Sequence, residues 1–129
     1  MPEKVLLDTN IIADFFNNIP EAVDLIMGLS PRRAAISVIT YTEVLAGFED
    51  PQQEHNFDLL RERLLYFSIE LSTARMAADL KRNHHWKLPD AYQAAIAIEH
   101  KMTLLTRDTK DFNPSEHKFV KIPYKLHHH

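Results

Sequence analysis

Val5-Leu6-Leu7-Asp8-Thr9-Asn10 is the stretch on which the fold depends. The apolar run over residues 4–7 is typical of a short buried strand, and it stops at three residues that favour caps and turns. Apolar residues then follow at helical spacing: Ile11, Ile12, Phe15 and Phe16. The segment therefore predicts a buried strand that leads directly into a helix, with Asp8 at the junction.

The same alternation continues along the chain. Further short apolar strands are expected at residues 34–38, 65–69, 103–105 and 119–122. Further helices are expected to begin near Pro20, Ile39, Gln53, Ser72 and Pro89. Short apolar strands that alternate with helices predict an α/β fold, a three-layer arrangement in which helices cover both faces of a central parallel sheet.

Length and composition limit the classes of protein. A chain of 129 residues is expected to form one domain over residues 1–124, and residues 125–129 resemble the start of a purification tag. The absence of Cys suits a reducing compartment. The sequence shows no basic segment followed by a long apolar run and no stretch of about 18 apolar residues, so we expect a cytoplasmic protein without a signal peptide or membrane helix.

Charge and glycine content exclude several kinds of site. The formal net charge is −3, whereas a protein that only coats nucleic acid is usually basic. An enzyme that reaches phosphate through a divalent cation need not be basic, because the cation supplies local positive charge. The two glycines, Gly28 and Gly47, cannot form a dinucleotide-binding loop or a P-loop.

Acidic residues fall where such a sheet would place a ligand. In an open α/β sheet, ligands bind outside the carboxyl ends of the strands. Asp8 directly follows the first expected strand, and Asp108 comes just after the fourth. Glu43 and Asp90 lie in the first turns of the helices that begin near Ile39 and Pro89.

Each acid also has a local structural explanation. Asp8 can cap the helix that begins near Thr9. Glu43 stands three residues after Thr40, at the spacing of a capping box. Asp90 complements the positive end of a helix dipole, and Asp108 suits a turn.

The four acids together are harder to explain by local structure alone. Clustered carboxylates repel one another, and burial disfavours their charge. Hard cations such as Mg²⁺ and Mn²⁺ prefer oxygen ligands, and a site of this kind can activate a water and stabilise a leaving oxygen. The pattern therefore indicates a site for one or two divalent cations.

Four segments of the chain resemble the PIN domain, and within it the VapC-type toxins of bacterial and archaeal toxin–antitoxin pairs. The first is the stretch over residues 5–10. The others are Ile39-Thr40-Tyr41-Thr42-Glu43-Val44-Leu45-Ala46-Gly47, Leu88-Pro89-Asp90-Ala91-Tyr92-Gln93-Ala94-Ala95 and Leu105-Thr106-Arg107-Asp108-Thr109-Lys110-Asp111-Phe112. They span nearly the whole chain in the order and spacing of the family, and one departure is Tyr92-Gln93, where relatives often have aliphatic residues.

The resemblance implies a sheet of about five parallel strands and Mg²⁺- or Mn²⁺-dependent cleavage of RNA. It also implies frequent homodimers and inhibition by a small antitoxin protein. The residues that match the four acidic positions of the family are Asp8, Glu43, Asp90 and Asp108. Thr106 matches a hydroxyl position that often orients the acids, and Asp111 matches a second acid sometimes seen near the metal, although a turn acid before Phe112 explains it equally well.

The roles of these residues follow as hypotheses. Asp8, Asp90 and Asp108 contact the metal directly or through water. Glu43 either completes the site or helps to deprotonate the attacking water. Three cations close to the acids in sequence are candidates for holding RNA phosphates, with solvated surface charge as the alternative: Lys87, Arg107 and Lys110.

Other readings of the chain stay open. A phosphoacceptor receiver domain also has acids around Mg²⁺, but it needs an acceptor Asp after the third strand, where this chain has Ile69-Glu70-Leu71. A PIN-like scaffold that only binds RNA or a partner protein would be expected to lack one or more of the acids. A PIN nuclease that processes RNA or cuts DNA would have the same acids.

Overall fold

The computed structural model describes residues 3–126 and contains a five-stranded, wholly parallel sheet. Its strands are β1 (Val5–Leu7), β2 (Ala34–Ser37), β3 (Leu65–Phe67), β4 (Thr103–Leu105) and β5 (Val120–Lys121). Their order across the sheet is β3-β2-β1-β4-β5, so the first strand lies in the centre. A receiver domain of the flavodoxin-like type has the order 2-1-3-4-5 instead, which excludes that alternative.

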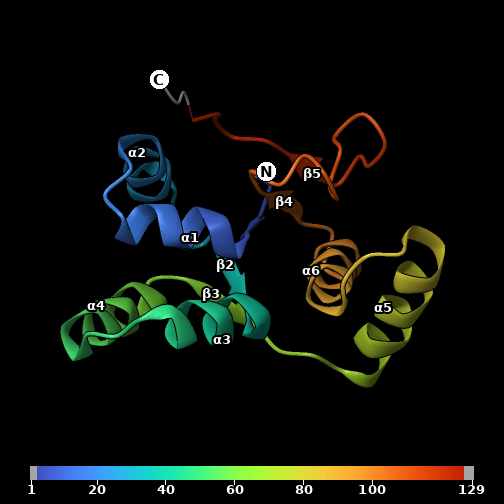
Figure 1. Ribbon diagram of the computed structural model, residues 1–129, viewed down its shortest axis with the longest axis horizontal. Helices are drawn as coiled ribbons and strands as arrows, with labels where there is room; N and C mark the ends of the chain where they lie inside the picture. Colours follow the sequence, from blue (N-terminus) through green and yellow to red (C-terminus); the bar gives the residue numbers. More distant parts are fainter. Residues whose placement is uncertain (1–2, 127–129) are drawn as a thin grey trace.

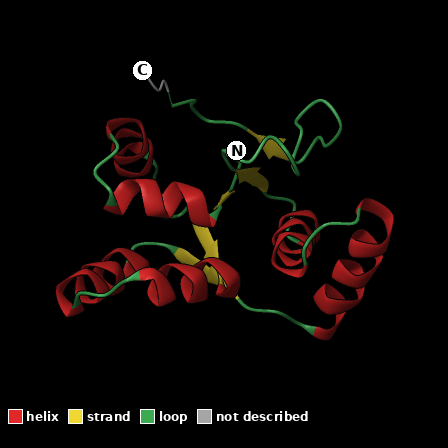
Figure 2. Ribbon diagram, in the orientation of Figure 1, coloured by secondary structure: helices red, strands yellow, loops and turns green. Residues whose placement is uncertain are grey.

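The helices cover both faces of the sheet, as predicted (Figures 1 and 2). They are α1 (Thr9–Phe16), α2 (Pro20–Gly28), α3 (Val38–Gly47), α4 (Pro51–Glu62), α5 (Leu71–His84) and α6 (Leu88–Glu99). In Figure 1, α1 to α4 lie on one side of the strands and α6 on the other, and α5 packs against the outer side of α6. No helix in residues 3–126 is long and apolar enough to cross a membrane.

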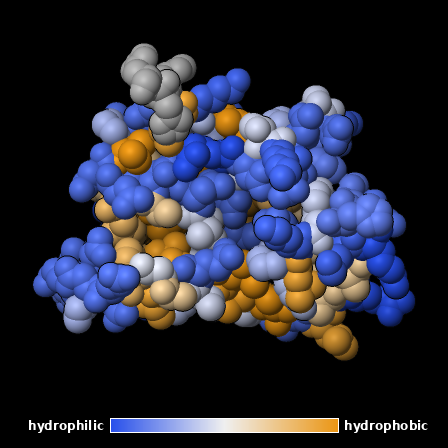
Figure 3. Space-filling view, viewed as in Figure 1, coloured by the Kyte–Doolittle hydropathy of each residue, from blue (hydrophilic) through white to orange (hydrophobic). Residues whose placement is uncertain are grey.

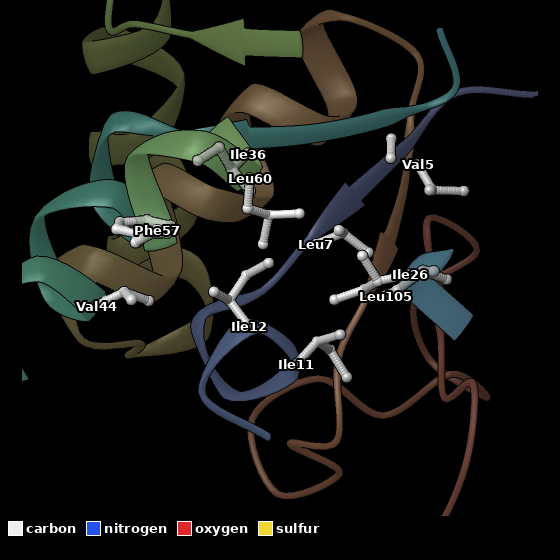
Figure 4. Close-up of a cluster of buried hydrophobic side chains, with 11 residues drawn as sticks. Val5, Leu7, Ile11, Ile12, Ile26, Ile36, Val44, Phe57, Leu60 and Leu105 are labelled. Carbon is white, nitrogen blue, oxygen red and sulfur yellow. The ribbon is translucent and has the colours of Figure 1, made fainter. Parts of the chain in front are cut away.

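The sheet has an apolar core on each face, and the side chains of β1 alternate between these two cores. Val5 and Leu7 belong to a cluster with apolar residues of α1 to α4, whereas Leu6 packs with α6 on the opposite face. Figure 4 shows the first cluster, in which Ile12 and Leu105 are drawn next to Leu7. Successive side chains of a strand point to opposite faces, so one apolar run supplies both cores and no position of β1 is free for solvent.

The observed helices and strands begin or end within a few residues of the predicted bounds, and the predicted cap of the fifth helix was wrong. Ser72 was expected to cap the fifth helix, but α5 begins at Leu71 and its N-cap is Glu70, which forms a capping box with Thr73. The Ser72 hydroxyl instead donates to Glu99 of α6 over 2.6 Å. Ser72 therefore connects α5 to α6 and does not cap α5. Of the proposed tag, residues 127–129 lie outside the described part of the chain.

Candidate active site

The site forms at the carboxyl ends of the central strands. Asp8 immediately follows β1 and is the N-cap of α1, where its side chain accepts a hydrogen bond from the Thr9 amide over 2.9 Å. Thr106 immediately follows β4, which pairs with β1 in parallel. The register of these two strands brings residues that are 98 positions apart into contact. The prediction that Asp8 caps a helix is thus confirmed, and the capping role and a site role use the same carboxylate.

Hydrogen bonds surround the buried Asp8 carboxylate, which is only 6% exposed. Its Oδ1 accepts from the Thr9 amide and from Nε2 of Gln93, both over 2.9 Å. Its Oδ2 accepts from the Thr106 hydroxyl over 2.7 Å. Burial raises the pKa of Asp8, while the hydrogen bonds from Gln93, Thr106 and Thr9 act in the opposite direction. The site thus supplies three donors that favour the charged form of an otherwise desolvated acid.

Asp90, Asp108 and Asp111 converge beside Asp8. Each offers a carboxylate oxygen, and the three oxygens lie within 4.8 Å of one another. Asp90 comes from the first turn of α6, while Asp108 and Asp111 come from the loop after β4. The family resemblance pointed to Asp111 as a second acid near the metal, with a turn acid as an equally good explanation, and its side chain lies in the cluster.

Partial burial and the surrounding acids raise the pKa of Asp90 to about 6. Desolvation is the main cause, and the negative charges of Asp8, Asp108, Asp111 and Glu43 add to it. A carboxyl that resists ionisation in this way gains from a nearby positive charge. The electrostatics therefore favour a cation among these acids.

Glu43 approaches the site from α3. Its Oε1 accepts from the Thr9 hydroxyl over 2.6 Å, which joins it to the residue that follows Asp8. The capping-box explanation for Glu43 was wrong, because the N-cap of α3 is Ser37 and Thr40 is buried inside the helix. The exposed Glu43 side chain therefore does not cap α3.

The loop after β4 is organised around the Thr106 hydroxyl and Asp108. This hydroxyl accepts from the Asp108 amide over 3.0 Å and from Nδ2 of Asn10 over 3.1 Å. Oδ1 of Asp108 accepts from the amides of Lys110 and Asp111, so the predicted turn role of Asp108 is confirmed. Asn10 was treated only as a turn residue in the sequence, and the link to Thr106 required the fold.

The three candidate phosphate contacts differ in environment. The Arg107 guanidinium binds Asp14 of α1 through Nε at 2.5 Å and Nη2 at 2.9 Å, so it already has an anionic partner. The side chains of Lys87 and Lys110 are exposed. The lysines are therefore more available to a substrate than the arginine.

Comparison with known proteins places this arrangement in a family. The model of the PIN domain matches residues 5–113, a range that includes all the acids described above. This chain is a PIN domain. No curated protein matches it closely enough to count as a relative.

Solved structures contain the same PIN domain fold. A toxin–antitoxin complex from Klebsiella pneumoniae has a chain that is 33% identical, with a TM-score of 0.86 over 95% of this chain and 100% of that one. FitAcB from Neisseria gonorrhoeae aligns over 95% and 99% of the two chains with 24% identity and a TM-score of 0.72. VapBC2 from Rickettsia felis, bound to a promoter DNA fragment, aligns over 83% and 89% with 22% identity and a TM-score of 0.72.

The donor set of this PIN domain fits a divalent cation. PIN domains in general use such ions and include nuclease toxins. All the clustered donors are carboxylate oxygens, which Mg²⁺ and Mn²⁺ prefer. Asp90, Asp108 and Asp111 are the residues that would hold the ion, with Asp8 next to them.

Proposed function

We propose that this PIN domain is a Mg²⁺- or Mn²⁺-dependent endoribonuclease that acts as the toxin of a toxin–antitoxin pair. The observation that supports it best is the convergence of Asp90, Asp108 and Asp111 within 4.8 Å, beside the buried Asp8. The choice of RNA as substrate rests on the resemblance to VapC-type toxins. The toxin role rests on that resemblance and on the complex from Klebsiella pneumoniae.

The bound cation would polarise the phosphate and lower the pKa of a water nucleophile. Asp90, Asp108 and Asp111 would bind it, and Asp8 would complete its ligands. Thr106 would keep Asp8 in place through its 2.7 Å hydrogen bond. Glu43, held by the Thr9 hydroxyl, would accept a proton from the attacking water or add a ligand.

Lys87 and Lys110 are the proposed phosphate contacts. Lys87 precedes α6, the helix of Asp90, and Lys110 lies between Asp108 and Asp111. Each places positive charge at the rim of an acidic site, where it would offset the repulsion between carboxylates and an RNA backbone. Arg107 would add positive charge at the same rim while its guanidinium remains paired with Asp14.

A small antitoxin is the proposed protein partner, and an apolar hollow offers it a place to bind. A hollow of about 550 Å³ lies between α1, α2 and α4, where Met27 is 52% and Leu59 50% exposed. A neighbouring hollow that contains Glu43 shares Phe16 and Gln53 with it. Figure 3 shows apolar side chains recessed between α1 and the α3–α4 pair. An amphipathic segment bound there could reach the site acids.

A second copy of this chain is the other proposed partner. Leu71, at the start of α5, is 88% exposed and is the most exposed large apolar side chain in residues 3–126. Figure 3 shows apolar side chains along the lower edge, between α3 and α5. Light scattering should give the mass of a dimer for the wild type and of a monomer for Leu71→Asp. A monomeric wild type would contradict this part of the proposal.

Cleavage of a mixed RNA pool tests the proposed activity. The purified protein is incubated with Mg²⁺, with Mn²⁺ and with excess EDTA, beside Asp8→Asn and Asp90→Asn. Asparagine also caps helices well, so Asp8→Asn should keep α1 intact. Asp24→Asn, an exposed change on α2, is the matched control.

The expected result is cleavage that requires the metal, is lost in both site variants and persists in the control. Cleavage that continues in EDTA or in the site variants would contradict the proposal. Cleavage of DNA instead of RNA would point to another PIN nuclease role. Metal binding without cleavage of any pool would indicate a narrower target, and neither binding nor cleavage would indicate a scaffold that only binds partners.

For the antitoxin, co-expression with any small protein that is encoded beside the gene is the direct test. The complex should co-purify with the wild type and be lost in Leu59→Glu and Met27→Glu. Lys118→Glu, an exposed charge change elsewhere, should leave the complex intact. If both Leu59→Glu and Met27→Glu retained the partner, the hollow between α1, α2 and α4 would not be its binding site.

A further inference from the structure

Gln93 is a buried polar residue on an otherwise apolar face of α6. Its side chain is 1% exposed, and the buried residues around it on the helix are Ala91, Ala94, Ala95, Ile96 and Ala97. An amide in such surroundings is costly unless all its hydrogen bonds are made. Among the described residues, no buried side-chain nitrogen or oxygen lacks a partner, so this cost is offset.

The hydrogen bonds determine which end of the amide faces the site. The Ser37 hydroxyl already accepts from the amides of Ile39 and Thr40, so its proton is directed to Oε1 of Gln93. With Oε1 engaged in this way, the amide nitrogen must point the other way. Nε2 donates over 2.8 Å to Thr40 and over 2.9 Å to Oδ1 of Asp8. The N-terminus of α3 thus orients an amide on α6 that reaches the end of β1.

The hydrogen bond from Gln93 leaves Asp8 with few free acceptor sites. Each carboxylate oxygen accepts about two hydrogen bonds. Oδ1 already accepts from Gln93 and from the Thr9 amide, while Oδ2 accepts only from Thr106. One acceptor site therefore remains, and it is on Oδ2, the oxygen linked through Thr106 to the loop of Asp108.

We propose that Gln93 is a positioning residue that occupies Oδ1 of Asp8, so that Asp8 binds the divalent cation through Oδ2 alone. This inference rests on the proposed metal-dependent function. Without the amide, Oδ1 has a free acceptor site and the carboxylate can rotate about its Cβ–Cγ bond. Gln93 touches neither the ion nor the substrate, and it acts through the orientation of Asp8.

Mn²⁺ binding to the whole protein, followed by electron paramagnetic resonance, tests this role independently of RNA. Gln93→Met keeps the length and unbranched shape of the side chain but has no donor. Gln52→Met makes the same change on α4, where the exposed side chain of Gln52 donates to Asn56 and its backbone amide keeps the bond to Asp50. Loss of a residue that orients a metal ligand costs on the order of 10- to 100-fold in metal affinity.

The expected result is a fall of on the order of 10-fold or more in Mn²⁺ affinity for Gln93→Met and none for Gln52→Met. Cleavage should recover in part at high Mn²⁺, because the acids remain. A folded Gln93→Met variant with the affinity of the wild type would overturn the inference. Circular dichroism at the temperature of the titration verifies the fold.

Ser37→Ala provides a second test that does not remove the amide. It frees Oε1, so the amide is no longer held with Nε2 toward Asp8. We expect a smaller loss of Mn²⁺ affinity than for Gln93→Met, and no further loss when Ser37→Ala is added to Gln93→Met. Additive losses in the two variants, or no loss from Ser37→Ala, would contradict the orienting role.

The outcomes separate this inference from the proposed function. A wild type that binds Mn²⁺, with lower affinity in Gln93→Met, but cleaves no nucleic acid in the pool would support the positioning role and indicate a narrower target for cleavage. A wild type that cleaves RNA, with unchanged Mn²⁺ affinity in Gln93→Met, would contradict the positioning role alone. A wild type that does not bind Mn²⁺ would overturn both.

Discussion

The Thr106 hydroxyl donates a 2.7 Å hydrogen bond to Oδ2 of Asp8 and so joins the end of β4 to the end of β1. The hydroxyl oxygen of Thr106 also accepts from the backbone amide of Asp108, so one hydroxyl contacts two of the site acids. Because both Thr106 and Asp8 are buried, no water is available to replace a lost donor.

Thr106→Val should therefore lower the free energy of unfolding by about 1–3 kcal/mol, because it leaves a buried carboxylate oxygen without a donor. Mn²⁺ affinity should fall as well. Thr106→Ser keeps the hydroxyl and should retain most of the stability and most of the Mn²⁺ affinity. Thr109→Val, at an exposed position, is the control. Urea denaturation measures the first quantity and a Mn²⁺ titration the second. Equal stability of the Val and Ser variants would mean that the hydroxyl contributes nothing.

Asp90→Asn should stabilise the metal-free protein at pH 7.5. The folded-state pKa of about 6 lies above the ordinary value of 3.8, so this carboxyl contributes stability that is present at low pH and lost as the pH rises through 6. The gain from the neutral amide should be on the order of 1 kcal/mol, after allowance for solvent screening of a half-buried group.

Thermal unfolding in EDTA at pH 5 and pH 7.5 measures this effect. The difference between Asp90→Asn and the wild type should shrink at pH 5, where the wild-type carboxyl is largely protonated. Addition of Mg²⁺ at pH 7.5 should stabilise the wild type much more than the variant. A variant that is less stable than the wild type at pH 7.5 in EDTA would show that repulsion among the acids is not the dominant effect.

Glu43→Gln should separate cleavage from metal binding. Glu43 is exposed and bonded to Thr9, and it does not belong to the cluster of Asp90, Asp108 and Asp111. We expect Mn²⁺ affinity close to that of the wild type and a rate of cleavage lower by on the order of 100-fold, as for loss of a general base. Glu62→Gln, an exposed change on α4, is the control. A parallel loss of affinity and rate would make Glu43 a ligand.

Arg107→Met should act mainly on stability. The guanidinium holds Asp14, whose side chain is 8% exposed and also accepts from the Tyr124 hydroxyl over 2.8 Å. Removal of the cation leaves a buried charge poorly compensated, which should lower the free energy of unfolding by about 1–3 kcal/mol. Chemical denaturation of Arg107→Met and Asp14→Asn measures it, and Asp24→Asn should have little effect.

Lys110→Gln should act on substrate instead. Its side chain is exposed, so stability should stay within about 0.5 kcal/mol of the wild type. RNA binding by Asp90→Asn protein, which should not cleave, is measured over a range of salt concentrations with and without Lys110→Gln. The salt dependence should weaken by about one unit of slope if the lysine neutralises a phosphate. An unchanged salt dependence of RNA binding would mean that Lys110 is only a solvated surface charge.

Local sequence determined the parts of this protein that depend on neighbouring residues. Apolar runs bounded by caps and turns predicted all five strands, and helical spacing predicted the helices within a few residues. Asp8 and Asp108 stand directly after strands, so the parallel sheet was enough to place them at one edge. The family motifs pointed to the same acids and to Thr106.

Only the tertiary structure decided the contacts between segments distant in the chain. Gln93 appeared in the sequence as a departure from an aliphatic position, and its bonds to Asp8 and Ser37 cross 85 and 56 positions. Arg107 appeared as a phosphate contact, but the fold pairs it with Asp14 across 93 positions. Cap and turn preferences act over a few residues, whereas the partner of a buried polar group depends on which strands are neighbours in the sheet. The sequence alone therefore determined which residues bear the charge, and the packing of α6 and α3 against the sheet decided how that charge is held.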